Sequence, residues 1–236
     1  MAVFLSFFVC VFFVASGLFA VDAQQQLLFK DSDLDLIYEL KKAEIIPTVF
    51  DEFKPLVSIS VQWANASAEY GNTINPSHTQ KEPKIELIGS TPSFLSNGKT
   101  PQLTVALTDP DAPSRDNPEW SEICHWLTTD VDLRKPDHDD DDGDEEDLIS
   151  KAIRILNSDV MPYKPPGPPP KTGKHRYVFV ALMPKNGTTD SLHLVKPDDR
   201  QHWGYKHERN GLRMWAEDMG LEVIGANFIY EQNDEQ

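Results

Sequence analysis

Hydrophobic and polar residues alternate with a period of two from Val57 to Trp63 and from Leu103 to Thr108. Lys84 to Ile88 and residues 221–230 are two further predicted strands. A period of two places successive side chains on opposite faces, which is typical of β-strands with one buried face. Residues 178–183 are hydrophobic at every position. We therefore expect this strand to lie in the middle of a sheet, covered on both faces.

Two stretches have helical spacing instead. Residues 211–219 place apolar side chains at i, i+3, i+4 and i+7, after Asn210 as a predicted N-cap and before Gly220. A second short helix is predicted after Ser32 and ends before Pro47. We expect residues 65–83 to form a polar loop. Several strands with two short helices and no internal repeat indicate an antiparallel β-sandwich with peripheral helices.

Length and charge limit the possible functions. The chain has 236 residues, and 39% of them are hydrophobic, which suits one packed domain. The formal net charge of −16 repels nucleic acid phosphates, so binding to DNA or RNA is not expected. A local anion site remains compatible with this charge, because salt screens distant carboxylates.

The first 23 residues have the pattern of a signal peptide. Residues 2–21 form an apolar run, and Val21 and Ala23 fit a small-residue cleavage site. The run has no preceding Lys or Arg and approaches membrane-spanning length, so an uncleaved anchor is the alternative. In both cases we expect a single domain over residues 24–236 that enters the secretory pathway, as a secreted or vacuolar protein. Asn65 and Asn186 then head usable glycosylation sequons.

Cysteine and acidic residues carry little chemistry of their own. Cys10 lies in the apolar run, so Cys124 is alone in the mature chain and forms no intrachain disulfide; we expect a buried hydrophobe. Residues 135–147 are a block of acidic residues and are predicted to be a disordered surface insertion. They lack the ligand spacing of a calcium loop. No metal or cofactor is predicted.

The chemistry-bearing residues fall in three separate motifs. Residues 109–115 read DPDAPSR, a proline-stiffened acidic loop at the end of a strand. His125 lies on the next strand, and residues 167–177 read GPPPKTGKHRY before the fully apolar strand. Taken one by one, these residues have structural readings: Asp109 and Asp111 can cap loop amides, and Arg115 can pair with either of them. Spacing alone does not show that His125 and His175 converge.

Together these motifs resemble the phosphatidylethanolamine-binding protein family, and most of all its fungal members related to carboxypeptidase Y inhibitors. The resemblance spans residues 34–230. It implies a mainly β sandwich of Greek-key type with a few short helices and a small pocket for a phosphate-like headgroup. The residues that it assigns to the pocket lining are Asp109, His125, His175, Tyr177, Pro168 and Pro169. Asp111 and Arg115 are expected to hold the loop.

The side chains expected in this pocket can bind a phosphate group. Histidine and tyrosine can donate hydrogen bonds to phosphate oxygens, and an aspartate can orient a histidine. We expect Asp109 to share its proton or to bond His125, which would raise the pKa of that imidazole. The chain departs from the family in two places. Ile123-Cys124 precede His125 where many members carry Trp and a second His, and no C-terminal helix follows Tyr230, so a more open pocket is expected.

The resulting prediction is a non-enzymatic binding protein for a phospholipid headgroup or another small phosphate-like anion. The alternative is an inhibitor of a serine carboxypeptidase of the carboxypeptidase Y type. Hydrolysis by an Asp/His pair is a third possibility, but the chain has no nucleophile elbow and no zinc-protease motif. No catalytic residue is therefore predicted.

Overall fold

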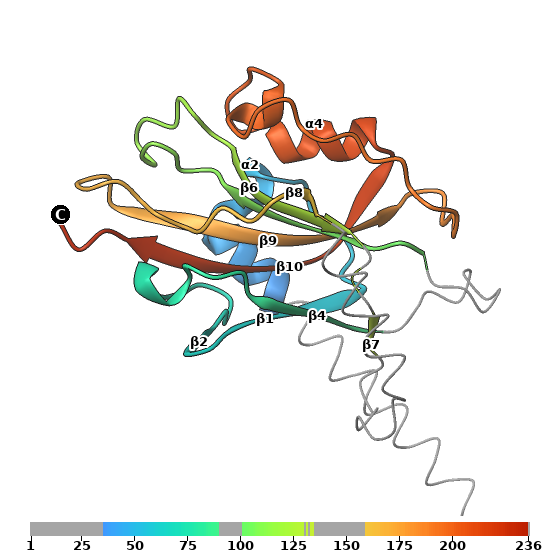
Figure 1. Ribbon diagram of the computed structural model, residues 1–236, viewed down its shortest axis with the longest axis horizontal. Helices are drawn as coiled ribbons and strands as arrows, with labels where there is room; N and C mark the ends of the chain where they lie inside the picture. Colours follow the sequence, from blue (N-terminus) through green and yellow to red (C-terminus); the bar gives the residue numbers. More distant parts are fainter. Residues whose placement is uncertain (1–34, 90–100, 130, 132, 135–158, 236) are drawn as a thin grey trace, which may run out of the picture. The chain divides into compact units, whose positions relative to one another are not determined.

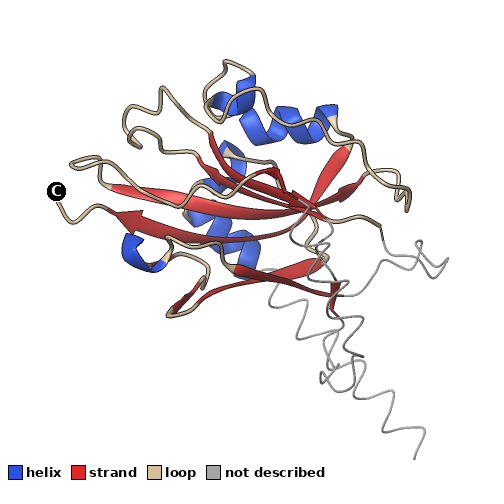
Figure 2. Cartoon of the chain, in the orientation of Figure 1, coloured by secondary structure: helices blue, strands red, loops and turns tan. Residues whose placement is uncertain are grey.

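The computed structural model describes residues 35–89, 101–129, 131, 133–134 and 159–235 (Figure 1). The chain divides into two compact units, residues 1–38 and 39–236, and the second unit holds both β-sheets. Strands account for most of its regular structure (Figure 2). The mainly β fold predicted from the alternating pattern is confirmed.

The smaller sheet has four strands in the order β2-β1-β4-β7. The larger has six, in the order β3-β10-β9-β5-β6-β8. The strands of the smaller sheet are β1 (Val57–Trp63), β2 (Ala66–Ser67), β4 (Lys84–Gly89) and β7 (Leu133–Arg134). Those of the larger are β3 (Asn72–Thr73), β5 (Thr104–Asp109), β6 (Ile123–Thr129), β8 (Asp159–Met161), β9 (Lys174–Pro184) and β10 (Leu221–Gln232).

Most neighbouring strands are antiparallel, as predicted. The exceptions are β3 with β10 and β7 with β4, which are short parallel pairs. Residues 65–83 are more ordered than the loop predicted from their polarity. They contain β2, β3 and the 3₁₀ turn η1 (Pro76–His78), because each short strand extends the edge of a sheet.

Helical segments are short. Residues 35–42 are helical, followed by α2 (Ile45–Thr48), and the start predicted at Ser32 lies outside the described residues. The turn η3 (His202–Gly204) precedes α4 (Gly211–Asp218), which confirms the predicted helix. Asn210 is the N-cap residue, but its side chain does not bond the helix amides. No helix among the described residues is long and apolar enough to span a membrane.

Strand β9 occupies the centre of the larger sheet between β5 and β10, as its uninterrupted apolar sequence predicts. Strand β5 was expected to have one exposed face, but all six of its residues are buried. The reason is that α4 and η3 cover the face turned away from β1 and β4 (Figure 1). The shared core between the sheets includes Val57, Ile59, Val61, Val105, Leu107, Tyr177, Phe179 and Ile229.

The two sheets approach each other closely beside Gly225. The Leu56 amide donates across to the Ile224 carbonyl at 2.8 Å, which joins the start of β1 to β10. A β-carbon at position 225 would lie 2.5 Å from the Val57 carbonyl oxygen. Glycine is therefore required here by backbone contact between layers.

Several predictions made from the sequence concern peripheral features. Cys124 is buried, as expected of a small hydrophobe. Asn65 and Asn186 are exposed, and Asn186 lies in the expected turn, in which Gly187 has a positive φ of 62°. The signal peptide over residues 1–23 and the acidic insertion at 135–147 lie outside the described residues.

Candidate functional site

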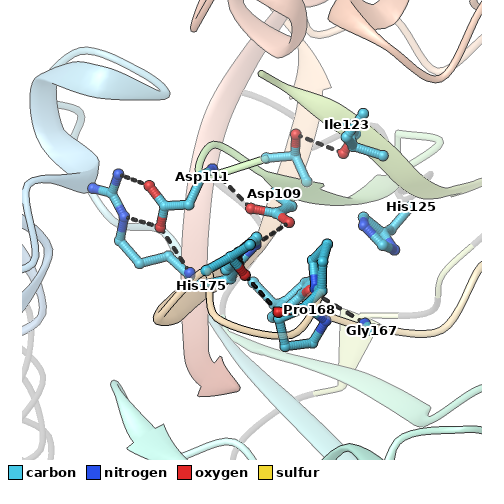
Figure 3. Close-up of polar contacts among 12 residues, drawn as sticks. Asp109, Asp111, Ile123, His125, Gly167, Pro168 and His175 are labelled. Carbon is cyan, nitrogen blue, oxygen red and sulfur yellow. Dashed lines mark hydrogen bonds and ion pairs between the residues drawn. The ribbon is translucent and has the colours of Figure 1, made fainter. Parts of the chain in front are cut away.

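The two carboxylates of the acidic loop are turned toward different partners (Figure 3). Asp109 Oδ1 accepts from the Asp111 amide at 2.7 Å, which closes the turn at the end of β5. Asp109 Oδ2 lies 2.9 Å from His175 Nδ1, and both side chains are buried. Asp109 therefore reaches across from β5 to the neighbouring strand β9.

Asp111 forms a buried ion pair with Arg176. Its two oxygens receive Arg176 Nε at 2.8 Å and Nη2 at 2.5 Å, and the Arg176 amide donates to Oδ2 at 2.9 Å. The remaining nitrogen, Nη1, donates to the carbonyls of Ala43 and Glu44. This bidentate geometry satisfies both charges in the interior. Arg115, which could have paired within the loop, lies 2.8 Å from Glu44 instead.

His125 is the extra residue of a β-bulge. Leu107 pairs with Trp126 and Thr108 pairs with Cys124, so His125 has no partner of its own on β5. A bulge re-aims the side chain that it inserts. Here it turns the imidazole onto the edge of Tyr177, with ring centroids 5.2 Å apart, although the next residue, Trp126, also belongs to the core.

An arginine that the sequence analysis did not single out holds this bulge. The Arg200 guanidinium donates from Nη1 to the carbonyls of Cys124 and His125, both at 3.0 Å, and from Nη2 to Pro162. A bulge disrupts the ladder and leaves backbone groups without their usual cross-strand partners. Arg200 supplies donors to them and so fixes the position of His125.

The expected bond between Asp109 and His125 is wrong. Asp109 bonds His175, and His125 Nδ1 lies 2.8 Å from the carbonyl oxygen of Lys164. A carbonyl only accepts, so Nδ1 carries the proton and Nε2 of the neutral ring has a lone pair. Burial lowers the pKa of His125 to about 4, and the charge of Asp109 offsets this only in part. His125 is therefore neutral at pH 7 without a ligand.

His175 has the opposite protonation. Its Nε2 lies 3.0 Å from the Thr172 hydroxyl oxygen, which is itself 2.7 Å from the Pro169 carbonyl. The carbonyl has no proton to offer, so the hydroxyl donates to it and accepts from Nε2. Nδ1 donates to Asp109. Burial opposes a charge on His175, but the bond to Asp109 outweighs it and raises the pKa. The raised pKa favours the imidazolium form of His175, in which both N–H groups are occupied.

A chain of hydrogen bonds thus links a carboxylate, an imidazole and a hydroxyl, from Asp109 through His175 to Thr172. A nucleophilic triad has this order of groups, but its hydroxyl proton points to the imidazole. Here the proton points from Thr172 to the Pro169 carbonyl. These hydrogen bonds orient His175 and leave no free base to activate the Thr172 hydroxyl.

Tyr177 lies between the two histidines. Its ring stacks on His175, with centroids 6.3 Å apart, and meets His125 edge to face. The Tyr177 hydroxyl accepts from the Gly167 amide at 3.2 Å. Its own proton has no acceptor among the described residues, and burial raises the pKa of Tyr177 well above its usual range. Tyr177 therefore offers one hydrogen-bond donor.

The two predicted prolines differ in exposure. Pro168 is buried beside Gly167 and Tyr177, whereas the side chain of Pro169 is exposed (Figure 3). The carbonyls of both are used, by Asn233 and Thr172 respectively. The proline-rich segment thus borders the site mainly through Pro168 and the Gly167 amide.

A buried glutamate at the end of β10 was missed by the sequence analysis. Glu231 pairs with His175 in the register of β10 and β9 and is fully buried. Its alternation with Ile229, a core residue, could have placed it on the inner face. A charged residue at a strand end is instead usually assigned to solvent.

An open groove of about 620 Å³ lies elsewhere, between residues 50–56, α4 and the start of β10. None of the predicted site residues lines it. The described residues contain no group of three His, Cys, Asp or Glu side chains arranged to hold a metal ion. The chemistry is therefore concentrated where β10, β9, β5 and β6 lie side by side.

Comparisons with known proteins agree with the fold and with the motifs. The chain is 29% identical to the carboxypeptidase Y inhibitor of Saccharomyces cerevisiae, over 88% of this chain and 98% of that protein. It is 31% identical to an uncharacterized protein of the same yeast, over 84% and 94% of the two chains. The crystal structure of the carboxypeptidase Y inhibitor with its cognate proteinase matches with a TM-score of 0.65 and 25% identity, over 86% of this chain and 97% of that chain.

A more distant structure shows the same fold. The phosphatidylethanolamine-binding protein of Plasmodium vivax matches with a TM-score of 0.59 and 19% identity, over 84% of this chain and 97% of that chain. The family model for phosphatidylethanolamine-binding protein matches residues 60–229, which span Asp109, His125, His175 and Tyr177. With these motifs set on the expected strands, the chain belongs to the phosphatidylethanolamine-binding protein family.

Proposed function

We propose that this chain is a non-enzymatic binding protein whose site takes a small phosphate-bearing headgroup. The observation that carries the proposal is the meeting of His125 from β6, Asp109 from β5 and Tyr177 from β9 in one buried cluster. Polar groups buried together are ordinarily satisfied, and a cluster with spare hydrogen-bonding capacity is a binding-site candidate.

The chemistry assigns a role to each residue. Tyr177 donates its unused proton to a phosphate oxygen. His125 has no N–H free for the ligand while it is neutral, so phosphate binding draws a proton onto Nε2 and raises its pKa from about 4. His175 keeps both protons on Asp109 and Thr172 and acts as a fixed positive charge. The direction of the Thr172 proton supports a non-enzymatic role.

Titration of the purified chain with inorganic phosphate and with phosphoethanolamine tests this function. Imidazole NMR signals report each histidine, and we expect the His125 signals to shift more than those of His175. The exposed His207 serves as an internal control. If the His125 and His175 signals both stay in place at millimolar ligand, the site does not bind phosphate headgroups.

Inhibition of a serine carboxypeptidase is the second candidate. It is favoured by the likeness to the yeast carboxypeptidase Y inhibitor over nearly that protein's full length. Incubation of the chain with carboxypeptidase Y should reduce peptide hydrolysis. Undiminished hydrolysis at micromolar excess of the chain would exclude this function.

Entry into the secretory pathway belongs to the same proposal. It rests on the apolar run at residues 2–21, and the exposure of Asn65 and Asn186 supports usable glycosylation sites. N-terminal sequencing of the protein from culture medium should give a start near Gln24. A start at Met1, or retention inside the cells without glycans, would contradict it.

A further inference from the structure

The open groove beside α4 has an apolar lining that comes from three separate parts of the chain. These parts are the segment before β1, the helix α4 and the start of β10. The apolar residues that they contribute include Phe50, Phe53, Leu56, Leu212, Ala216 and Ile224. The volume of about 620 Å³ is within the range of protein ligand sites. The groove is therefore a candidate binding site separate from the proposed headgroup site.

Strand β10 has an open edge at this groove. Strand β9 pairs with β10 along its length, but β3 pairs with the other side of β10 only at Ile229 and Tyr230. From Leu221 to Ile224, the only backbone hydrogen bond that described residues make to that side joins the Leu56 amide to the Ile224 carbonyl. Unpaired N–H and C=O groups at the edge of a sheet are a template for another strand.

The segment on the other side of the groove does not close this edge. No backbone–backbone hydrogen bond joins residues 51–55 to the rest of the described chain, and Pro55 has no N–H to donate. The rings of Phe50 and Phe53 meet edge to face, with centroids 5.5 Å apart, and both line the groove. The gap thus has an unpaired strand edge on one side and aromatic rings on the other, which suits an extended peptide.

Charged residues around the groove indicate the polar part of its partner. Two of the acidic lining residues are matched within the chain, Asp51 by Arg213 and Glu52 by Lys41. The charged lining residues that form no ion pair with another described residue are Lys54, Lys185, Glu217 and Glu222. Two cations and two anions therefore remain for a segment that carries both signs of charge. The net charge of −16 on the whole chain favours approach of a segment with a net positive charge.

We propose that this groove docks an extended peptide segment of a partner protein, which adds a strand to the open edge of β10 at residues 221–224. Apolar side chains at alternate positions of the segment enter the groove, and the charged side chains between them meet the charged rim. In this mode main-chain hydrogen bonds supply affinity and the side-chain pockets supply selectivity. The proposal does not depend on the headgroup-binding function.

Titration of the purified chain with designed peptides tests the proposal. The probe is an acetylated and amidated hexapeptide with the sequence Leu-Lys-Leu-Glu-Leu-Lys. One control peptide carries N-methyl groups on its leucines, and the other carries them on its lysines and glutamate. Alternate N–H groups of a strand face the same side, so one control should bind about 10-fold or more weakly than the probe and the other nearly as well.

Backbone NMR locates the bound peptide on the chain. The amide signals of Glu222 and Ile224 should shift on addition of the probe, because both residues lie on the part of β10 that lines the groove. The amide signals of Asp109 and His125 report the proposed headgroup site and should stay in place. This comparison uses the unaltered chain.

Two matched variants test the apolar lining. Phe53→Ala removes part of the wall and should weaken binding of the probe by about 5-fold or more. Val195→Ala shortens an apolar side chain that is 61% exposed and lies outside the groove, so it should leave the affinity unchanged. The methylated peptides need no variant to fold.

Each contrary result removes a stated part of the proposal. Absence of binding at millimolar probe overturns it, and so do equal affinities of the two methylated peptides, because an added strand pairs along one edge only. Shifts confined to residues outside the groove overturn the location. Shifts of the Glu222 and Ile224 amides on dilution without peptide would show that a second copy of the chain occupies the groove, and would overturn the partner segment. The phosphate titration decides the headgroup function separately.

Discussion

Each face of the larger sheet has one fully buried glutamate, Glu122 or Glu231, and the two differ in their hydrogen bonding. On the face toward α4, Glu122 accepts from Thr108 at 3.0 Å, and Thr108 in turn accepts from Trp203 at 3.1 Å. The amides of Gly211 and Leu212 at the start of α4 also lower the pKa of Glu122. On the face toward β1, Glu231 has no such partner.

The two glutamates nevertheless share one property. Burial is the largest influence on each and raises both pKa values to about 7. The two carboxyls differ in their hydrogen-bond partners. Glu122 Oε2 accepts from Thr108 while its Oε1 has no partner, and neither oxygen of Glu231 has one.

The largest expected effect on stability comes from removal of the buried ion pair between Asp111 and Arg176. Asp111→Ala leaves the guanidinium buried without its carboxylate, so unfolding free energy should fall by about 3–5 kcal/mol in urea denaturation. Arg115→Ala removes the exposed pair with Glu44 and is the control, with an expected loss of at most about 1 kcal/mol. Equal losses would show that Asp111 does not anchor the loop.

The pH dependence of stability tests both glutamates together. Between pH 4.5 and about 7 the folded chain holds protons that the unfolded chain has released, so unfolding free energy falls as pH rises through this window. Each residue should contribute about 1–3 kcal/mol between pH 5 and pH 8. Denaturation of Glu231→Gln and of Glu122→Gln should each show a flatter profile than the unaltered chain. An unchanged profile for either variant would place the pKa of that residue in its usual range.

A smaller effect concerns the charge of His175. Asp109→Asn removes the carboxylate that stabilises the imidazolium, so the pKa of His175 should drop by about one unit or more in an NMR titration. Asp116→Asn, an exposed carboxylate of the same loop, should leave it in place. A constant pKa in Asp109→Asn would mean that another group holds the proton on His175.

The smallest expected effect distinguishes two tyrosines. Tyr177→Phe removes the unused donor and should weaken binding of inorganic phosphate by about 5- to 10-fold, near 1 kcal/mol, with a similar small loss of stability. Tyr163→Phe is matched to it, because the Tyr163 hydroxyl is already committed to the Thr79 carbonyl at 2.7 Å. It should lose stability without losing phosphate affinity. Equal phosphate binding by both variants would remove Tyr177 from the site.

The sequence predicts the strands and the cluster of motifs well, because alternation and proline-bounded loops are local signals. The apolar run at residues 178–183 correctly indicated the central strand, and residues 211–219 the helix. The partner of Asp109 was predicted wrongly. A bulge inserts His125 on β6, where its Nδ1 bonds the Lys164 carbonyl and not Asp109. A bulge leaves no mark in the hydrophobic pattern.

Other features depend on contacts that no pattern records. Arg200 acts on backbone carbonyls of a strand some seventy-five residues away in sequence. Arg176 sits within the recognised HRY motif, yet its match to Asp111 appears only when β9 and the acidic loop meet. Glu231 was overlooked because a strand end is usually solvated. In this chain Glu231 is fully buried, and Thr79, which follows η1, lies close enough to lower its pKa.

The close contact at Gly225 affects the position of the far end of β10. Strand β10 is continuous from Leu221 to Gln232, so Gly225 and Glu231 lie on the same strand, about 20 Å apart at the usual rise per residue. The backbone of Gly225 is in close contact with Val57, so a methyl group added at position 225 would push β10 away from β1. The spacing between β10 and β1 near the proposed site is thus set in part by a residue outside that site.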